Sequence, residues 1–240
     1  MDDKLELLDG QLALWLVPLV QEDDCVRQCY RDLVAAEQAR AKRFSTEILS
    51  SKYIVAHAAL RQILSRYFDV SPSAVDIAVQ PFGKPYCPDQ NIMFNLSHCK
   101  KWAVIGLIRD QEIGVDIEEM SRKINPLELT QRFFTAAELE WLMGFCSERE
   151  QREAFLQLWT IKEAVLKYTG MGLSQELSSF EVTRDVSGHW LMSVVGASAD
   201  EQPTLHIFSQ ERLLGDDFHI LSAVVTNTPA EVDLREWEFC

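Results

Sequence analysis

Two long helical patterns with short strands behind them constrain the fold of this chain more than any other feature of its sequence. Apolar residues recur at helical spacing over residues 47–68 and again over residues 154–168. Short apolar or alternating runs follow each pattern and predict strands: residues 75–79, 91–95 and 102–108 after the first, and 180–183, 190–194, 205–208 and 218–225 after the second. Long helices combined with runs of strands indicate the α+β class.

The two parts of the chain repeat one order of elements. A strand over residues 12–19 and helical segments to about residue 43 precede the first long helix, and a strand over 113–117 and helical residues 127–145 precede the second. We therefore expect two similar α+β half-domains, residues 1–111 and 112–240. A cleft between two such half-domains is a common place for a ligand.

Charge and cysteine usage narrow the function classes. The net charge of −14 argues against a nucleic-acid partner, so a basic cluster in this chain carries more information than usual. The sequence contains no apolar run of about 18 residues and no secretory leader, so we expect a cytoplasmic protein without a membrane span. Its six cysteines form no C-x-x-C pair, so we expect free thiols rather than disulfides or a metal finger.

The run IGVDIEE, residues 113–119, predicts a strand with two carboxylates on one face. Gly114, Asp116 and Glu118 alternate with three apolar residues, so Asp116 and Glu118 point the same way. Two hard oxygen ligands on a short strand suit Mg²⁺, and Gly114 would allow a ligand or another backbone to approach closely. The alternative is an edge strand whose polar face is solvated.

The run LWTIKEAVLKYTGMGLS, residues 158–174, predicts a helix that is apolar on two sides. One stripe would face the core: Leu158, Ile161, Val165 and Tyr168. Trp159 and Leu166 lie on the other side and flank Glu163 and Lys167. The i, i+4 spacing of Glu163 and Lys167 also fits an ordinary ion pair along a helix. A carboxylate on a covered face requires a cation, which Lys167 or a metal shared with the strand would supply.

Two upstream runs offer groups that could hold phosphate. FGKPY, residues 82–86, predicts a turn centred on Lys84, and FNLSH, residues 94–98, places Ser97 and His98 at the end of a strand. Arg43 closes a basic stretch that could hold a further phosphate. A structural histidine and a solvated helix face are the alternatives. Ser97 and His98 are neighbours on a strand and point to opposite faces, which argues against a Ser–His nucleophile pair.

Taken together, these runs resemble the Sfp-type 4′-phosphopantetheinyl transferases. The resemblance covers about residues 40–174 and rests on five motifs in the order of that family: Phe82-Gly83-Lys84-Pro85, Phe94-Asn95-Leu96-Ser97-His98, Ile113-Gly114-Val115-Asp116-Ile117-Glu118, Arg132-Phe133-Phe134 and Trp159-x-x-Lys162-Glu163-Ala164-x-x-Lys167. Cys99 departs from the pattern, because many members have a serine after the histidine. The resemblance implies two α+β halves related by a pseudo-two-fold axis, with the active site in the cleft between them.

The resemblance also implies an activity and a set of site residues. The enzyme would move the phosphopantetheine arm of coenzyme A to a serine of an apo acyl or peptidyl carrier protein, releasing adenosine 3′,5′-bisphosphate. Asp116, Glu118 and Glu163 would bind Mg²⁺, with Asp116, Glu163 and Lys167 catalytic and Glu163 the candidate base. Coenzyme A would contact seven residues: Arg43, Gly83, Lys84, Pro85, Ser97, His98 and Lys167.

Further expectations concern the base, the partner and the alternatives. A metal and Lys167 beside Glu163 should lower its pKa, so a water could relay the proton instead. An acidic carrier would dock on five residues: Arg122, Lys123, Arg132, Phe133 and Phe134. We expect a monomer serving fatty-acid, polyketide or nonribosomal peptide synthesis. The alternatives are a Mg²⁺-dependent nucleotide or diphosphate hydrolase and a non-catalytic module that binds coenzyme A or a carrier protein.

Overall fold

The structure is a computed structural model that describes residues 4–239. The chain divides into two compact units, the first comprising residues 1–80, 85–110 and 230–240 and the second residues 81–84 and 111–229. Both units combine helices with sheets, which confirms the predicted α+β class. The C-terminal segment 230–240 was expected in the second half-domain but belongs to the first unit, because β11 (Glu231–Glu236) pairs with β1 (Gln11–Pro18).

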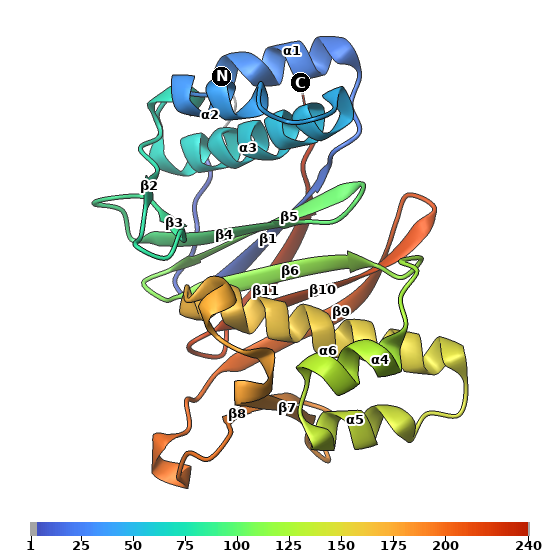
Figure 1. The fold of residues 1–240 in the computed structure, drawn as a ribbon. Coiled ribbons are helices and arrows are strands. Elements are labelled where there is room, and N and C mark those ends of the chain that lie inside the picture. Colours follow the sequence, from blue (N-terminus) through green and yellow to red (C-terminus); the bar gives the residue numbers. More distant parts are fainter. Residues whose placement is uncertain (1–3, 240) are drawn as a thin grey trace. The chain divides into compact units, whose positions relative to one another are not determined.

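The first unit packs three helices with a four-stranded sheet. Besides β1 and β11, its elements are α1 (Asp23–Asp32), α2 (Ala35–Ala41), α3 (Glu47–Phe68), η1 (Pro72–Ala74), β2 (Ala78–Val79), β3 (Pro85–Tyr86), β4 (Ile92–His98) and β5 (Trp102–Arg109). The sheet has the order β11-β1-β5-β4, in which β1 runs parallel to β11 and antiparallel to β5 (Figure 1). The first strand and first long helix thus match their predicted positions.

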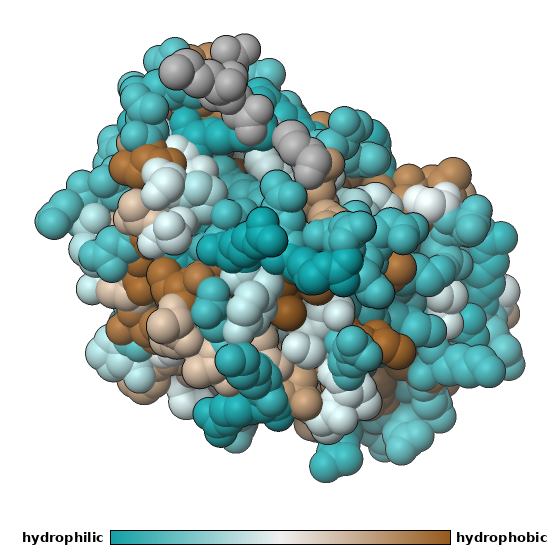
Figure 2. Space-filling model, turned by 90° about the horizontal axis from the view of Figure 1, so that it is seen from above, coloured by the Kyte–Doolittle hydropathy of each residue, from teal (hydrophilic) through white to brown (hydrophobic). Residues whose placement is uncertain are grey.

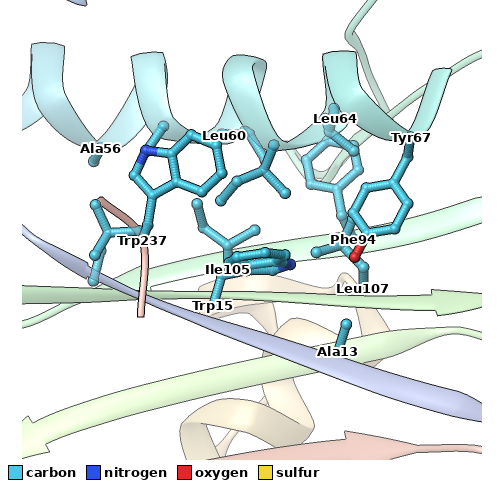
Figure 3. Packing of buried hydrophobic residues seen from close by; sticks show 14 of the residues in the cluster. Ala13, Trp15, Ala56, Leu60, Leu64, Tyr67, Phe94, Ile105, Leu107 and Trp237 are labelled. Carbon is cyan, nitrogen blue, oxygen red and sulfur yellow. The ribbon is translucent and has the colours of Figure 1, made fainter. Parts of the chain in front are cut away.

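The core of the first unit lies between α3 and this sheet (Figure 3). Leu60 and Leu64 point from α3 toward Trp15 on β1 and Ile105 on β5. Trp237, directly after β11, packs edge-on against Trp15 with ring centroids 5.5 Å apart. Burial of these aromatic rings fixes the C-terminal segment on the first unit.

The outer surface of the first unit is mostly hydrophilic over its helices (Figure 2). Helix α1 shows why: it buries only Cys29, whereas Asp23, Asp24 and Arg27 are exposed. Such a helix presents one apolar stripe to its neighbours and a charged face to water.

The second unit packs a 22-residue helix, α6 (Glu148–Thr169), on a three-stranded antiparallel sheet. Its other elements are β6 (Ile113–Glu119), α4 (Pro126–Phe133), α5 (Ala136–Met143), η2 (Gly172–Ser174), η3 (Leu177–Ser179), β7 (Phe180–Arg184), β8 (Trp190–Val194), η4 (Ala199–Glu201), β9 (His206–Leu214) and β10 (Asp217–Val225). The sheet order is β6-β10-β9, and β7 pairs with β8 in a separate hairpin.

Local signals explain where α6 begins and ends. Ser147 and Glu150 form a capping box, so the helix starts six residues before the predicted 154. Gly170 adopts a left-handed conformation, with φ of 69°, and ends the helix. Ile161 and Val165 are fully buried against the sheet, as their predicted place in the core-facing stripe requires.

Three other segments differ from their predicted form. The helical residues 127–145 split into α4 and α5 because the side chain of Thr135 caps the amide of Glu138 and starts a new helix. The strand expected over 75–79 is reduced to β2. Strand β11 was not predicted, since its polar sequence EVDLRE lacks a continuous apolar run.

Within residues 4–239, no helix is both long and apolar enough to cross a membrane. The five cysteines in the described part of the chain are free thiols, as expected. The sixth, Cys240, lies outside the described residues.

Candidate active site

The carboxylates of β6 lie on the strand face that packs against α6. A Cβ atom at Gly114 would overlap the backbone of Ala164 and Tyr168, so only glycine allows this close approach of helix and strand. Asp116 follows two residues later on the same face. The close contact at Gly114 therefore brings the polar side chains of α6 beside the strand, as the sequence predicted.

Lys167 joins the two elements directly. Its Nζ lies 2.6 Å from Asp116 Oδ1, in an ion pair that crosses from α6 to β6. The Asp116 side chain is 8% exposed and that of Lys167 is 27% exposed. The sequence also allowed an ion pair of Lys167 with Glu163 along the helix; the pair with Asp116 links the helix to β6.

Glu118 is held from a different direction. The guanidinium of Arg122 forms an ion pair with Glu118 and lies 5.6 Å from the ring centroid of Trp159 on α6. Trp159 in turn packs against Phe134 and Phe155. Arg122 thus lies between Trp159, which was expected to wall the site, and Glu118, an expected metal ligand.

Burial raises the pKa of the carboxyl groups in this cluster. The pKa of Glu118 rises to about 7 because the group is buried, and the negative charges of Asp116 and Glu163 add to the rise while Arg122 and Lys167 oppose it. The pKa of Glu163 also rises, from burial first and from Asp116 second. These carboxylates are poorly hydrated, so a bound cation would stabilise their charged forms.

The low pKa expected for Glu163 depended on a metal as well as Lys167, and the protein by itself has the opposite shift. Burial and the negative charge of Asp116 outweigh the favourable fields of Lys167 and Arg122. Without further positive charge, Glu163 takes up a proton more readily than an ordinary glutamate does.

The four groups Asp116, Glu118, Glu163 and Lys167 come together on β6 and α6. In residues 4–239, however, the oxygens of the three carboxylates do not all lie within 4.8 Å of one another. Lys167 holds Asp116 and Arg122 holds Glu118, and both cations would have to move for the three to share one ion. The donor set itself, three hard oxygen ligands, fits Mg²⁺ better than a soft metal.

Lys84 also belongs to the second unit, where it is almost fully buried. Its Nζ donates a hydrogen bond to the carbonyl of Tyr168, 2.9 Å away at the end of α6, and forms an ion pair with Glu112. Burial lowers the pKa of Lys84, and Glu112 partly offsets that effect. Gly83 precedes it with φ of 94°, a conformation that favours glycine.

Four other predicted ligand residues lie in the first unit. Arg43 is exposed after α2, and Pro85 lies on β3. On β4, Ser97 is buried and His98 is exposed, in agreement with the expectation that they point to opposite faces. The thiol of Cys99 donates to the carbonyl of Trp102 at 3.5 Å, so that residue has a local structural contact.

The proposed docking residues differ in accessibility. Lys123 and Arg132 are exposed, Phe133 is half-buried, and the Arg122 side chain is 41% exposed. Phe134 is only 7% exposed and stacks on Phe155 with ring centroids 5.7 Å apart. Phe134 therefore supports the surface from beneath and is not itself available to a partner, which corrects its expected role.

Sequence reasoning assigned no role to Lys162, although this residue belongs to the last motif. Lys162 is 1% exposed and pairs with Glu138, another residue without an expected role. One feature of the sequence could have indicated its burial: Lys162 lies four residues from both Leu158 and Leu166, so it shares a helix face with apolar residues.

Comparisons with known proteins show which family this sequence is similar to. The profile of the 4′-phosphopantetheinyl transferase superfamily matches residues 112–221. The 4′-phosphopantetheinyl transferase HetI of Nostoc sp. is 33% identical over 175 residues, which cover 71% of this chain and 73% of that protein. The 4′-phosphopantetheinyl transferase Sfp of Bacillus subtilis is 32% identical over 167 residues, covering 69% of this chain and 71% of Sfp.

Solved structures show a more distant likeness. A holo-(acyl-carrier-protein) synthase from Bacillus anthracis, in complex with CoA (3′,5′-ADP), aligns with a TM-score of 0.37 and 21% identity. The alignment covers 48% of this chain and 94% of that protein.

Proposed function

This chain belongs to the 4′-phosphopantetheinyl transferase superfamily, and we propose that it moves the phosphopantetheine arm of coenzyme A to a serine of an apo carrier protein. The products are the holo carrier protein and adenosine 3′,5′-bisphosphate. The observation that carries this proposal is the group of Asp116, Glu118, Glu163 and Lys167 on β6 and α6. Three carboxylates and an ammonium suit the transfer of a charged phosphoryl group.

We propose that Asp116, Glu118 and Glu163 hold a magnesium ion. Their carboxylates are hard ligands, and burial raises the pKa of Glu118 and of Glu163 despite the nearby cations Arg122 and Lys167, so further positive charge would stabilise both carboxylates. When bound, Mg²⁺ neutralises charge on the pyrophosphate of coenzyme A. Lys167 and Arg122 would then be released from the carboxylates toward the substrate phosphates.

Glu163 and Lys167 have complementary parts in the reaction. The serine oxygen of the carrier attacks the phosphorus that bears the pantetheine arm, and the bond from that phosphorus to the nucleotide phosphate breaks. Glu163 would accept the serine proton, directly or through one water. A magnesium ion bound to Glu163 would lower its pKa, which favours the route through water. Lys167 neutralises or protonates the departing phosphate.

Coenzyme A would contact both units of the chain in this proposal. Arg43, Pro85, Ser97 and His98 would bind it from the first unit. Gly83 would approach it through its backbone, and Lys167 through its ammonium. Lys84 would contribute mainly by anchoring the turn, because its ammonium is buried against Glu112 and the Tyr168 carbonyl. The cleft between the two halves stays a prediction.

The second substrate would be an acidic carrier protein. We propose that it docks on Arg122, Lys123, Arg132 and Phe133. These residues place exposed cations on the surface of a chain that is otherwise strongly acidic. The enzyme would act in the cytoplasm as a monomer, since one chain supplies every residue named here. Light scattering of the purified protein tests the monomer.

One experiment tests the transferase proposal. The protein is incubated with coenzyme A, Mg²⁺ and an apo acyl carrier protein, and the carrier is analysed by intact mass. We expect the mass to increase by the phosphopantetheine arm, and Asp116→Ala and Glu163→Ala each to abolish the increase while the circular dichroism spectrum is retained. Failure to modify any of several unrelated carriers would refute the proposal.

The same assay separates the alternatives. A Mg²⁺-dependent hydrolase would release adenosine 3′,5′-bisphosphate from coenzyme A without any carrier. A binding module would bind coenzyme A or the carrier and leave both unchanged. The presence of a complete set of carboxylates together with Lys167 favours the transferase over the binding module.

A further inference from the structure

Lys162 precedes the candidate base Glu163 but points away from the site. Consecutive residues of an α-helix are turned by about 100°, so neighbours on α6 face different surroundings. The Lys162 side chain is 1% exposed and enters the core of the second unit, between the rings of Phe134 and Phe180 at 5.0 and 4.4 Å. A lysine buried in this way cannot touch the substrates.

The ammonium of Lys162 has three oxygen partners. It lies 2.8 Å from Glu138 Oε1 on α5, and it donates to the carbonyls of Leu177 and Phe180, each 2.7 Å away. An ammonium has three donors, so its capacity is filled. These bonds tie α6 both to the helix before it and to the chain after it.

Glu138 is equally well held on its side of the pair. Its Oε1 accepts a hydrogen bond from the Val182 amide at 2.7 Å, and its Oε2 accepts one from the Thr135 amide at 2.9 Å. Glu138 therefore links the start of α5, strand β7 and helix α6 through one carboxylate.

Such a pair is a poor source of stability. Removing two charges from water carries a large desolvation cost, and well-packed apolar residues often stabilise a fold as well or better. Directional bonds, however, specify one arrangement, whereas apolar contacts permit a helix to slide or turn. The pair thus has a geometric consequence that the apolar core around it would not provide.

The geometry that the pair specifies is the rotation of α6. On one side the helix backbone rests against Gly114 of β6, and on another Lys162 is fixed to α5 and β7. With both contacts set, Glu163 and Lys167 face the strand carboxylates. We propose that Lys162 is a positioning residue for phosphopantetheinyl transfer, which holds Glu163 and Lys167 in register with Asp116 and Glu118. This role rests on the proposed function of those four residues.

The test compares Lys162→Met with a control that weakens the same core elsewhere. Ile207→Ala, on β9, removes buried apolar atoms from this core and leaves the Lys162–Glu138 ion pair in place. We expect both variants to lower the melting temperature. Only Lys162→Met should weaken Mn²⁺ binding, measured by electron paramagnetic resonance, by about 10–100-fold, the usual effect of losing a residue that orients metal ligands. Its kcat should fall more than its KM for coenzyme A rises.

A double variant keeps the test decisive if Lys162→Met folds poorly. Lys162→Met combined with Glu138→Gln removes both charges and should restore the melting temperature. If Lys162 positions the helix, Mn²⁺ affinity and kcat stay low in the double variant. If Lys162 only neutralises Glu138, both recover, and the proposal is overturned. An unchanged Mn²⁺ affinity in Lys162→Met, or an equal loss in Ile207→Ala, also overturns it.

The outcome for the wild-type chain is separate from this comparison. If the wild-type chain binds Mn²⁺ and modifies the carrier, and Lys162→Met does both equally well, only the positioning role is refuted. A wild-type chain that neither binds Mn²⁺ nor modifies any carrier would refute the proposed function, and the positioning role with it.

Discussion

Lys167 Nζ lies 2.6 Å from Asp116 Oδ1, so helix α6 and strand β6 are joined by an ion pair at the centre of the candidate site. In this arrangement the lysine occupies the position from which a metal ion would attract the same oxygen. If Asp116 binds the metal as proposed, Lys167 and the metal would compete for it, and metal binding would release Lys167 toward the substrate.

Lys167→Met separates these two roles. We expect Mn²⁺ to bind at least as tightly as in the wild type, because Asp116 loses its competing cation. At the same time kcat should fall about 100- to 1000-fold, the usual loss when one group that stabilises developing charge is removed. Calorimetric titration with Mn²⁺ and the carrier-modification assay measure the two effects. Weaker Mn²⁺ binding would show that Lys167 supports the metal site instead.

The raised pKa of Glu118 predicts pH-dependent metal binding. At a pKa of about 7, this carboxyl is partly protonated at neutral pH, and a metal must displace its proton. Mn²⁺ affinity should therefore rise as the pH increases from 6 to 8, by about tenfold per pH unit below the pKa, and then level off. Titration at several pH values tests this, with Glu118→Gln as the control: its affinity should be lower and should vary less over this range.

The same shift predicts how stability depends on pH. The pKa of Glu118 rises from 4.5 to about 7 on folding, so the folded chain binds this proton more tightly than the unfolded chain. Its contribution to stability is present below pH 4.5 and is lost as the pH rises to 7. The raised pKa of Glu163 acts in the same direction. Without metal, Glu118→Gln should have the higher melting temperature at pH 8 and gain little at pH 5, as measured by calorimetry. An equal difference at both pH values would contradict the shift.

Gly114→Ala should disrupt the site through the backbone. The new Cβ would overlap the backbone of Ala164 and Tyr168, so α6 must move away from β6. We expect a loss of about 1–3 kcal/mol in the free energy of unfolding, as for other overpacked sites, together with weaker Mn²⁺ binding. Urea denaturation and Mn²⁺ titration measure these effects.

Gly144→Ala is the matched control for this substitution. Gly144 has φ of −68°, which any residue adopts, and an added Cβ would come no closer than 3.2 Å to the Trp141 carbonyl. We expect little change in stability and none in Mn²⁺ binding. If Gly114→Ala behaved like Gly144→Ala, the close contact of α6 with β6 would not determine the site.

Local sequence patterns predicted the strand and the helix that carry the candidate site. They could not predict which distant segments pair with each other. Alternation placed Asp116 and Glu118 on one face of β6, and helical spacing placed Trp159 and Glu163 on a covered side of α6. Those patterns depend on a few neighbouring residues. Strand β11 was missed because its pairing with β1 joins opposite ends of the chain and its sequence is polar.

Charge partners were the second gap in what the sequence could predict. Lys167 pairs with Asp116 across two elements, and Lys162 pairs with Glu138 on another helix. Neither choice is set by spacing, because each depends on how the helix packs. The raised pKa of Glu163 in the protein by itself could not be predicted for the same reason, since burial is a property of the packed unit.

Charge reversal at Lys123 and Arg132 tests the carrier-docking surface. Both residues are exposed, and Arg132 lies 5.0 Å from the ring centroid of Phe133. The double variant Lys123→Glu/Arg132→Glu should raise the KM for an acidic carrier about tenfold at low salt, and less at high salt, because the attraction is screened. Mn²⁺ affinity should stay within about twofold, because solvent and salt screen exposed charges. Arg122→Gln provides the contrast: this residue holds Glu118, so Mn²⁺ should bind more tightly. If the double variant kept the wild-type KM at low salt, the carrier would have to dock elsewhere.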